Sequence, residues 1–326
     1  MAAHYQPEWG RSADFSIVDL RRVSAWELDP LLLAETVEWE QRLDWDYSKS
    51  ADLVREFAST GSLAGAAIMD GGAVAGYGYT AMEDHKGLIG NLYVRPELRG
   101  TRTEAALFHA LLQDLINAPQ VRRIESQLML VDRPTALTVA HEAGLRLYER
   151  TLMSCGVDAL RNSMSAAGSG EFRLEPWGDQ WNEAAAMVIL HAYRDHVDSN
   201  INDQYRAFGS ASRFLKNLVE FQGCGTFFSP AGLMAFDKVT GHPAGLALCS
   251  FVAPAVGHVT QLCVTPNARE KGLGYALLRA AAIRLADAGA VRIGLTVTLA
   301  NLPALNLYQR CGFRDVRRFF AYAREV

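Results

Sequence analysis

Apolar residues recur with two different periods along this chain. Short apolar runs predict strands, and runs with apolar residues three or four positions apart predict helices. In the C-terminal half the pattern predicts a strand at 172–174, helices over 179–196 and 210–221, strands at 232–238, 245–252 and 258–264, a helix over 275–287, a strand at 292–297, a helix over 303–311 and a strand at 313–322. This order favours an α/β fold (α+β mixed sheet) with helices on both faces.

The two halves of the chain repeat the same pattern. Residues 93–99 (YVRPELR) match residues 263–269 (CVTPNAR), and each block follows a strand-like run and precedes a helical run. Glycines at 144 and 312 then recur at nearly the same displacement from these blocks. Residues 158–170 are small, polar and non-periodic, which is typical of a linker. We therefore expect a duplicated domain, with copies at 1–157 and 171–326.

Length and charge restrict the class of protein. A chain of 326 residues with 49% hydrophobic and 21% charged residues fits two folded domains. The chain has 32 Lys and Arg against 36 Asp and Glu, which gives a net charge of −4. It contains no run of basic residues, and this argues against a nucleic-acid partner. The N-terminus is polar, and no apolar run approaches the roughly 18 residues of a membrane span. We expect a cytoplasmic protein with no membrane partner.

The cysteines suggest neither a metal site nor a redox motif. They are scattered and odd in number, and no two form a CxxC pair. Free thiols in a reducing compartment are therefore expected, with no metal cofactor. The five are Cys155, Cys224, Cys249, Cys263 and Cys311.

A glycine-rich turn between a predicted strand and a predicted helix is the first candidate site. It reads REKGLG over residues 269–274. Glycines allow a ligand to approach the backbone, and a helix N-terminus offers N–H groups to a pyrophosphate. The turn lacks the Gly-Lys-Ser/Thr of a Walker loop, and Leu277 stands where a Rossmann fingerprint has its third glycine. A purely structural tight turn remains the alternative.

Two motifs in sequence raise the pyrophosphate interpretation above that alternative. The first is Val264-x-Pro266-x-x-Arg269-x-x-Gly272-x-Gly274, and the second runs from Asn301 through Tyr308 to Gly312-Phe313. Together they resemble the GNAT superfamily of acyltransferases, whose members use acetyl-CoA. The resemblance covers the C-terminal half well and the N-terminal half in outline. It implies two tandem GNAT-like domains, each with a mixed, mostly antiparallel sheet flanked by helices.

The resemblance also implies roles for individual residues. Main chain of the strand end would contact the pantetheine arm and direct the acyl carbonyl, and the turn would hold the pyrophosphate. Tyr308 would be the general acid for the departing thiolate; packing against Phe313 is its structural alternative. Asn301 would contact the cofactor arm or merely cap a helix. The cofactor-binding residues expected are Leu262, Cys263, Val264, Arg269, Glu270, Lys271, Gly272, Leu273, Gly274 and Asn301.

The general base is less well defined by the sequence. Many relatives have a glutamate on the strand before Val264, whereas here the stretch 258–263 has no carboxylate. His258 is the nearest ionisable candidate for the base. The alternation of side chains along a strand predicts that His258 and Leu262 lie on the same face. Two alternatives for the base are deprotonation relayed by water and a residue of the polar loop at 195–206. A covalent route through Cys263 has no paired His and Asp to support it.

The N-terminal copy departs from the motif. Arg102 stands where the C-terminal copy has Gly272, Glu104 stands at the position of Gly274, and Ala140 at that of Tyr308. Side chains at the first two positions would crowd the ligand, and a carboxylate would repel phosphate. We expect this copy to keep the fold and to have lost or weakened acyl-CoA binding.

The polar loop at 195–206 is the candidate acceptor site. Its acidic residues Asp198 and Asp203 would bind a cationic amine, although a solvated loop explains them equally well. The sequence thus predicts an N-acyltransferase that moves acetyl from acetyl-CoA to the primary amine of a small molecule or peptide by direct attack. A non-catalytic CoA-binding sensor is the alternative function. The sequence is compatible with a homodimer and does not decide the oligomeric state. Tandem relatives that acetylate a thiol-sugar amine are similar, but no residue singles out that acceptor.

Overall fold

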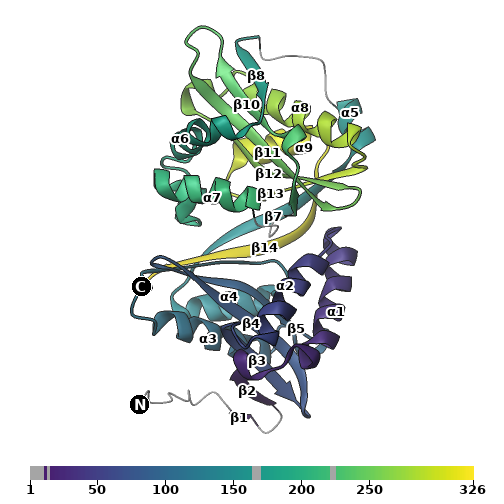
Figure 1. Cartoon of the computed structure of the whole chain (residues 1–326), viewed down its shortest axis with the longest axis vertical. Coiled ribbons are helices and arrows are strands. Elements are labelled where there is room, and N and C mark those ends of the chain that lie inside the picture. Colours follow the sequence, from purple (N-terminus) through teal and green to yellow (C-terminus); the bar gives the residue numbers. More distant parts are fainter. Residues whose placement is uncertain (1–10, 13–14, 164–169, 221–224) are drawn as a thin grey trace. The chain divides into compact units, whose positions relative to one another are not determined.

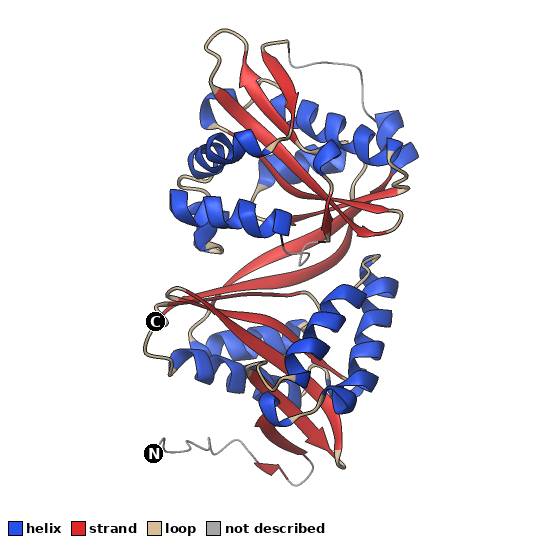
Figure 2. Ribbon diagram, viewed as in Figure 1, coloured by secondary structure: helices blue, strands red, loops and turns tan. Residues whose placement is uncertain are grey.

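The computed structural model describes residues 11–12, 15–163, 170–220 and 225–326 and contains two compact units (Figure 1). Unit 1 comprises residues 1–38, 47–149 and 319–326, and unit 2 comprises 39–46 and 150–318. Each unit consists of a twisted sheet with helices on both faces (Figure 2). The predicted fold class, a mixed sheet flanked by helices, is confirmed.

In unit 1 the strands pair in the order β1-β2-β3-β4-β5-β6-β14, antiparallel except for the parallel pair β5 and β6. Its strands are β1 (Arg11–Ser12), β2 (Phe15–Asp19), β3 (Gly65–Asp70), β4 (Ala73–Glu83), β5 (Lys86–Val94), β6 (Arg123–Leu128) and the end of β14 (Arg314–Glu325). Its helices are α1 (Ala25–Leu43), most of which lies in this unit, α2 (Ser48–Ser59), α3 (Arg102–Ile116) and α4 (Arg133–Ala143).

In unit 2 the order is β8-β10-β11-β12-β13-β7, again antiparallel except for the parallel pair β12 and β13. Its strands are β7 (Arg146–Gly156, from residue 150), β8 (Phe172–Pro176), β9 (Thr226–Phe227), β10 (Leu233–Asp237), β11 (Pro243–Ala253), β12 (Val256–Val264) and β13 (Arg292–Thr298). Its helices are α5 (Val157–Ser163), α6 (Asn182–Ala192), α7 (Phe208–Glu220), α8 (Leu273–Asp287) and α9 (Leu302–Arg310).

The last strand of each half of the chain completes the sheet of the other unit. Strand β7 pairs with β13 from Arg150↔Thr298 to Gly156↔Arg292, and the end of β14 pairs with β6 from Phe320↔Leu128 to Glu325↔Arg123. The compact units therefore differ from the predicted domains 1–157 and 171–326 by this exchange and by residues 39–46, which belong to unit 2. Strand pairing over more than a hundred residues leaves no local signal in the sequence. The predicted linker 158–170 is helical to Ser163, and 164–169 lie outside the described residues.

The core of unit 2 follows from alternation along β11. Leu246 and Leu248 pack with α6 and α7 on one face, whereas Ala247 and Cys249 pack with α8 on the other. Both faces are thus covered, which explains why β11 is almost continuously apolar. Figure 1 shows α6 and α7 on one side of these strands and α8 on the other.

The bounds of α6 and the state of the cysteines can be compared with the predictions. The helix predicted over 179–196 is shorter, because α6 ends at Ala192 and Asp195 has a φ of +59°. The cysteines of the described segments, Cys155, Cys249, Cys263 and Cys311, are buried and form no disulfide with one another; Cys224 lies outside these segments. Among the described residues no helix is long and apolar enough to span a membrane, and no group of three or more potential ligands could hold a metal ion.

Candidate active site

A gap opens in the sheet of unit 2 where β12 and β13 separate. Their parallel pairing begins at Val256↔Arg292 and ends at Val259↔Leu295, but β12 continues to Val264. A pocket of about 1110 Å³ lies at this gap, between the end of β12, the start of α8, the length of α9 and the end of α6. It is lined by Ala192, Tyr193, His196, Leu262, Cys263, Val264, Ala268, Arg269, Glu270, Gly272, Leu273, Gly274, Tyr275, Asn301, Pro303, Ala304, Asn306, Leu307, Tyr308, Gln309 and Arg310.

The glycine-rich turn forms the N-terminal end of α8 at this pocket. Glu270 and Gly272 have left-handed φ values of +64° and +78°, and Gly272 caps the helix. The first N–H groups of a helix have no partner within it, so they can bind an anion. A Cβ at Gly274 would lie 3.6 Å from Leu307 Cδ2 and 3.8 Å from Val264 Cγ2, beside two other residues of the pocket wall. The bare backbone at this position therefore leaves room for a ligand.

The two basic side chains of the turn behave differently. Arg269 lines the pocket, and its Nη2 donates to the carbonyl oxygen of Ala192 at 2.7 Å, which ties the turn to the end of α6. Lys271 is not among the described residues that line the pocket, and its Nζ lies 3.1 Å from a carboxylate oxygen of Glu171. Arg269 is therefore the nearer source of positive charge for a bound anion.

Helix α9 brings Asn301 and Tyr308 to the opposite wall. The side chain of Asn301 accepts a hydrogen bond from the Ala304 N–H at 3.4 Å, so it caps α9 and also lines the pocket. Tyr308 is buried, lines the pocket, and lies 6.0 Å from the ring of Phe313. Burial, with a smaller effect from the Asp198 carboxylate, raises the pKa of Tyr308. This side chain therefore keeps its proton at neutral pH and can donate it.

A bulge in β12 corrects the predicted facing of His258. The pairs Cys249↔Val259 and Leu248↔Gln261 leave Thr260 as an extra residue. Because directly opposed residues share a face, His258 lies with Gln261 on the α6 face and not with Leu262. His258 is buried, and its ring packs edge-on against Trp45 with the ring centroids 5.2 Å apart. Burial lowers the pKa of His258 to about 4. It is not among the described residues that line the pocket.

The two predicted acceptor carboxylates do not reach the pocket wall either. Asp198 is buried, with 8% of its surface exposed, and accepts a hydrogen bond from Thr298 Oγ1 at 2.5 Å. Asp203 is half-buried at the start of a 3-10 helix, Asp203–Tyr205. Neither is among the described pocket-lining residues. A carboxylate that faces protein partners is poorly placed to capture a cation directly.

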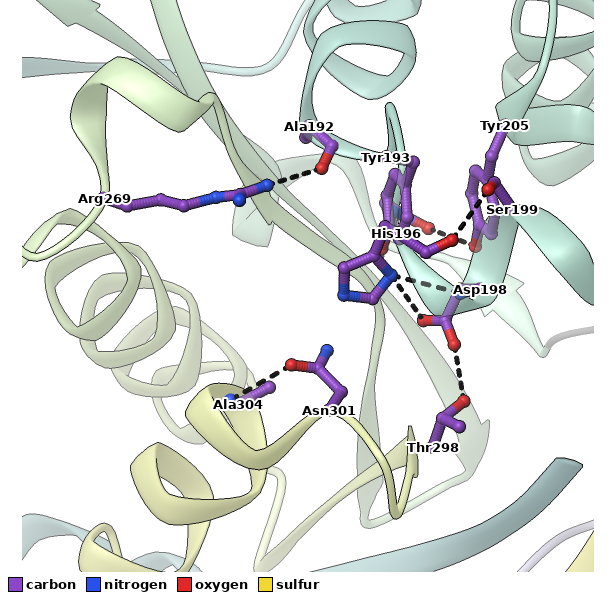
Figure 3. Close-up of polar contacts among 11 residues, drawn as sticks. Ala192, Tyr193, His196, Asp198, Ser199, Tyr205, Arg269, Thr298, Asn301 and Ala304 are labelled. Atoms are coloured by element: carbon purple, nitrogen blue, oxygen red, sulfur yellow. Dashed lines mark hydrogen bonds and ion pairs between the residues drawn. The ribbon is translucent and has the colours of Figure 1, made fainter.

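The pocket wall includes two residues that the sequence analysis missed, Tyr193 and His196. Tyr193 stacks on Tyr205 with ring centroids 3.8 Å apart, and its hydroxyl accepts from Gln261 Nε2 at 2.8 Å. The hydroxyl of Tyr205 donates to Gln261 Oε1 at 3.3 Å, so one amide fixes both rings. Figure 3 shows His196 between Tyr193 and Asp198. The polar loop signalled this region, but not which of its residues faces the pocket.

In unit 1 the side chain of Glu104 occupies the corresponding turn at the start of α3. Gly100, with a φ of +66°, stands at the position of Glu270, and Thr101 caps α3. The buried carboxyl group of Glu104 accepts hydrogen bonds from the Gly100 N–H at 2.8 Å and from Thr135 Oγ1 at 2.5 Å. The α3 N-terminus thus has an internal carboxyl partner where α8 has a pocket. This is in line with the prediction that this copy has lost or weakened acyl-CoA binding.

The arrangement in unit 2 suits a thioester that carries phosphates. The start of α8 offers N–H groups to an anion, the separated end of β12 offers main-chain groups to an extended arm, and Tyr308 offers a proton. Burial raises the pKa of Cys263 to about 12, which keeps it a thiol and disfavours a covalent route.

Comparisons with known proteins agree with this geometry. The Acetyltransferase (GNAT) family profile matches residues 197–313. A mycothiol acetyltransferase of Clavibacter sepedonicus is 29% identical over 242 residues, which cover 73% of this chain and 73% of that protein. A GCN5-related N-acetyltransferase from Sphaerobacter thermophilus superimposes with a TM-score of 0.67 over 98% of this chain and 97% of its own, at 16% identity. A tandem GNAT protein from the clavulanic acid biosynthesis pathway superimposes with a TM-score of 0.59 over 96% of this chain and 98% of its own, at 16% identity.

Proposed function

We propose that the chain is an acetyltransferase of the GNAT family and that its unit 2 transfers an acetyl group from acetyl-CoA to a primary amine. One observation carries the proposal: a single pocket is lined by the glycine-rich start of α8, the free end of β12 and the hydroxyl-bearing Tyr308. The first two groups are neighbours in the sequence, Tyr308 lies more than thirty residues beyond them, and together they match the phosphate, the arm and the sulfur of one ligand.

Acetyl-CoA would lie along the gap between β12 and β13. The N–H groups from Lys271 to Gly274 would hold the pyrophosphate, with Arg269 beside them. Main chain of residues 262–264 would bind the pantetheine arm and polarise the acyl carbonyl. The residues fit such a ligand because the turn carries no Cβ at Gly272 or Gly274 and the wall at Leu307 is apolar.

The chain's own groups would serve direct attack on the thioester. The amine nitrogen bonds to the acyl carbon, the carbon–sulfur bond breaks, and the leaving sulfur takes a proton from Tyr308. Burial raises the pKa of Tyr308, so the hydroxyl is protonated before the step. General acid catalysis of this kind contributes typically about 10²–10⁴-fold in rate.

The acceptor would enter from the side of Tyr193 and His196. Both line the pocket at the end of α6. Because the curated relative is named a mycothiol acetyltransferase, a mycothiol-type amine belongs in the first panel of acceptors.

Release of free CoA from acetyl-CoA, measured against amines, amino acids, aminoglycosides and peptides, tests the proposal. Tyr308→Phe is expected to lower kcat by about 10²-fold or more while acetyl-CoA still binds. Tyr322→Phe is the matched control, since Tyr322 is a buried tyrosine of unit 1 whose hydroxyl has no hydrogen-bond partner among the described residues. Tight CoA binding with no turnover across the panel would favour the sensor alternative instead.

A further inference from the structure

The chain turns sharply after α6 and brings an imidazole to the pocket. Asp195 has a φ of +59°, and His196, the next residue, lines the pocket. The ring of His196 packs edge-on against Tyr193 at a centroid distance of 5.2 Å. Because Tyr193 is itself fixed by stacking and by Gln261, the imidazole packs against a rigid wall.

One nitrogen of this imidazole faces Asp198. Nδ1 lies 3.2 Å from the main-chain N of Asp198, whose N–H donates to it, and 3.8 Å from the carboxylate oxygen Oδ2. The other carboxylate oxygen, Oδ1, accepts from Thr298 Oγ1, a buried hydroxyl at the end of β13 (Figure 3). The sheet therefore fixes the carboxylate, and the carboxylate stands beside Nδ1. Nε2 is left on the side of the ring away from Asp198.

We propose that His196 is the general base for the acceptor amine and that Asp198 is its positioning residue, an inference that rests on the proposed acetyl transfer. When Nδ1 carries the proton and donates it to Oδ2, the lone pair of Nε2 becomes available. In the structure Nδ1 instead accepts from the Asp198 N–H, so the proposed tautomer requires this hydrogen bond to break and the 3.8 Å separation from Oδ2 to shorten by about 1 Å. Hydrogen bonds of catalytic groups commonly tighten in this way when substrate binds.

The proton balance of the step is complete. The amine arrives as an ammonium ion and gives one proton to Nε2 of His196. Its nitrogen then bonds to the acyl carbon, the carbon–sulfur bond breaks, and the sulfur takes the Tyr308 proton. The second proton of the attacking nitrogen replaces the one that Tyr308 lost. The proton on His196 leaves to solvent, while the Asp198 carboxylate offsets the charge of the imidazolium ion.

Other groups at or near the pocket fit the role less well. Burial raises the pKa values of Cys263 and Tyr308, so both hold protons already. Glu270 lies in the turn at the start of α8, on the phosphate side. His258 lies outside the described pocket lining.

The test compares His196→Gln with His191→Gln, an exposed histidine on α6 outside the described pocket lining. Release of CoA is followed with ethylamine, glycinamide and trifluoroethylamine, whose basicity falls in that order. With ethylamine, His196→Gln is expected to lose about 10²-fold in kcat relative to wild type. With trifluoroethylamine, which is largely unprotonated at neutral pH, the loss should shrink to less than about tenfold, because no base is then needed. Asp198→Asn should show the same trend with smaller losses.

Calorimetric titration with acetyl-CoA distinguishes a lost catalytic step from a misfolded protein. His196→Gln and Asp198→Asn should both bind acetyl-CoA with the affinity of wild type. Equal losses for the three amines, or activity equal to that of His191→Gln, would overturn the assignment while leaving acetyl transfer intact. If wild type itself releases no CoA with any amine of the panel, acetyl transfer fails and the base assignment fails with it.

Discussion

Gly274→Ala should separate the stability of unit 2 from its binding of acetyl-CoA. Gly274 is the second residue of α8, where alanine is the better helix former by up to about 1 kcal/mol. The added Cβ would meet Leu307 Cδ2 at 3.6 Å and Val264 Cγ2 at 3.8 Å, which are ordinary contact distances. The folded protein should therefore tolerate the methyl group, and Tm should rise by up to about 2–4 °C.

Binding should change in the opposite direction. The same Cβ adds a methyl group to the pocket wall beside the helix N-terminus, where the pyrophosphate would approach the main chain. Loss of one hydrogen bond to a charged group costs about 1.5–3 kcal/mol, or roughly 10–150-fold in Kd. Calorimetric titration with acetyl-CoA and thermal unfolding of the free protein measure the two effects separately.

Gly209→Ala is the matched control. Gly209 is also the second residue of its helix, α7, and an added Cβ there would meet nothing within 4 Å. It is exposed and not among the described pocket-lining residues, so it should stabilise without changing Kd. If Gly274→Ala binds acetyl-CoA as tightly as Gly209→Ala, the α8 N-terminus is not the pyrophosphate site.

Two further predictions concern unit 1 and the buried histidine. Acetyl-CoA should titrate to one site per chain, because Glu104 closes the α3 N-terminus; two equivalent sites would contradict this. Since burial lowers the pKa of His258 to about 4, the unfolded chain takes up its proton first as the pH falls. About 3 kcal/mol of stability should be lost between roughly pH 6.5 and 4. Chemical denaturation should show a smaller loss in His258→Leu; identical pH curves for the two proteins would rule out this origin.

Local pattern was enough to predict much of unit 2. The apolar periods located β11, β12 and α8, and the order of the predicted elements correctly implied a sheet with helices on both faces. The glycine-rich turn was also predicted to precede a helix, and Gly272 is the N-cap of α8. Each of these features depends on residues close together in the sequence, so it can be read from the sequence alone.

The site was only partly predictable for the same reason. The family motifs named Tyr308 and the turn at 269–274, and the pocket brings Tyr308 together with most of that turn. Strict alternation put His258 on the wrong face, because a single extra residue in β12 reverses the side that every later residue faces. The sequence placed Asp198 in an open loop, whereas Thr298 on a distant strand fixes it inside the protein.

The sequence by itself thus determined the elements, their duplication and the residue types at the turn. Only the tertiary structure decided which unit each terminal strand completes, that Glu104 occupies the end of its own helix, and that His196 faces the pocket. The strand exchange and the bond from Thr135 to Glu104 depend on strand register and on contacts between residues about thirty to two hundred positions apart. Helix and strand periodicity describes a residue's neighbours along the chain and carries no information about partners at that separation.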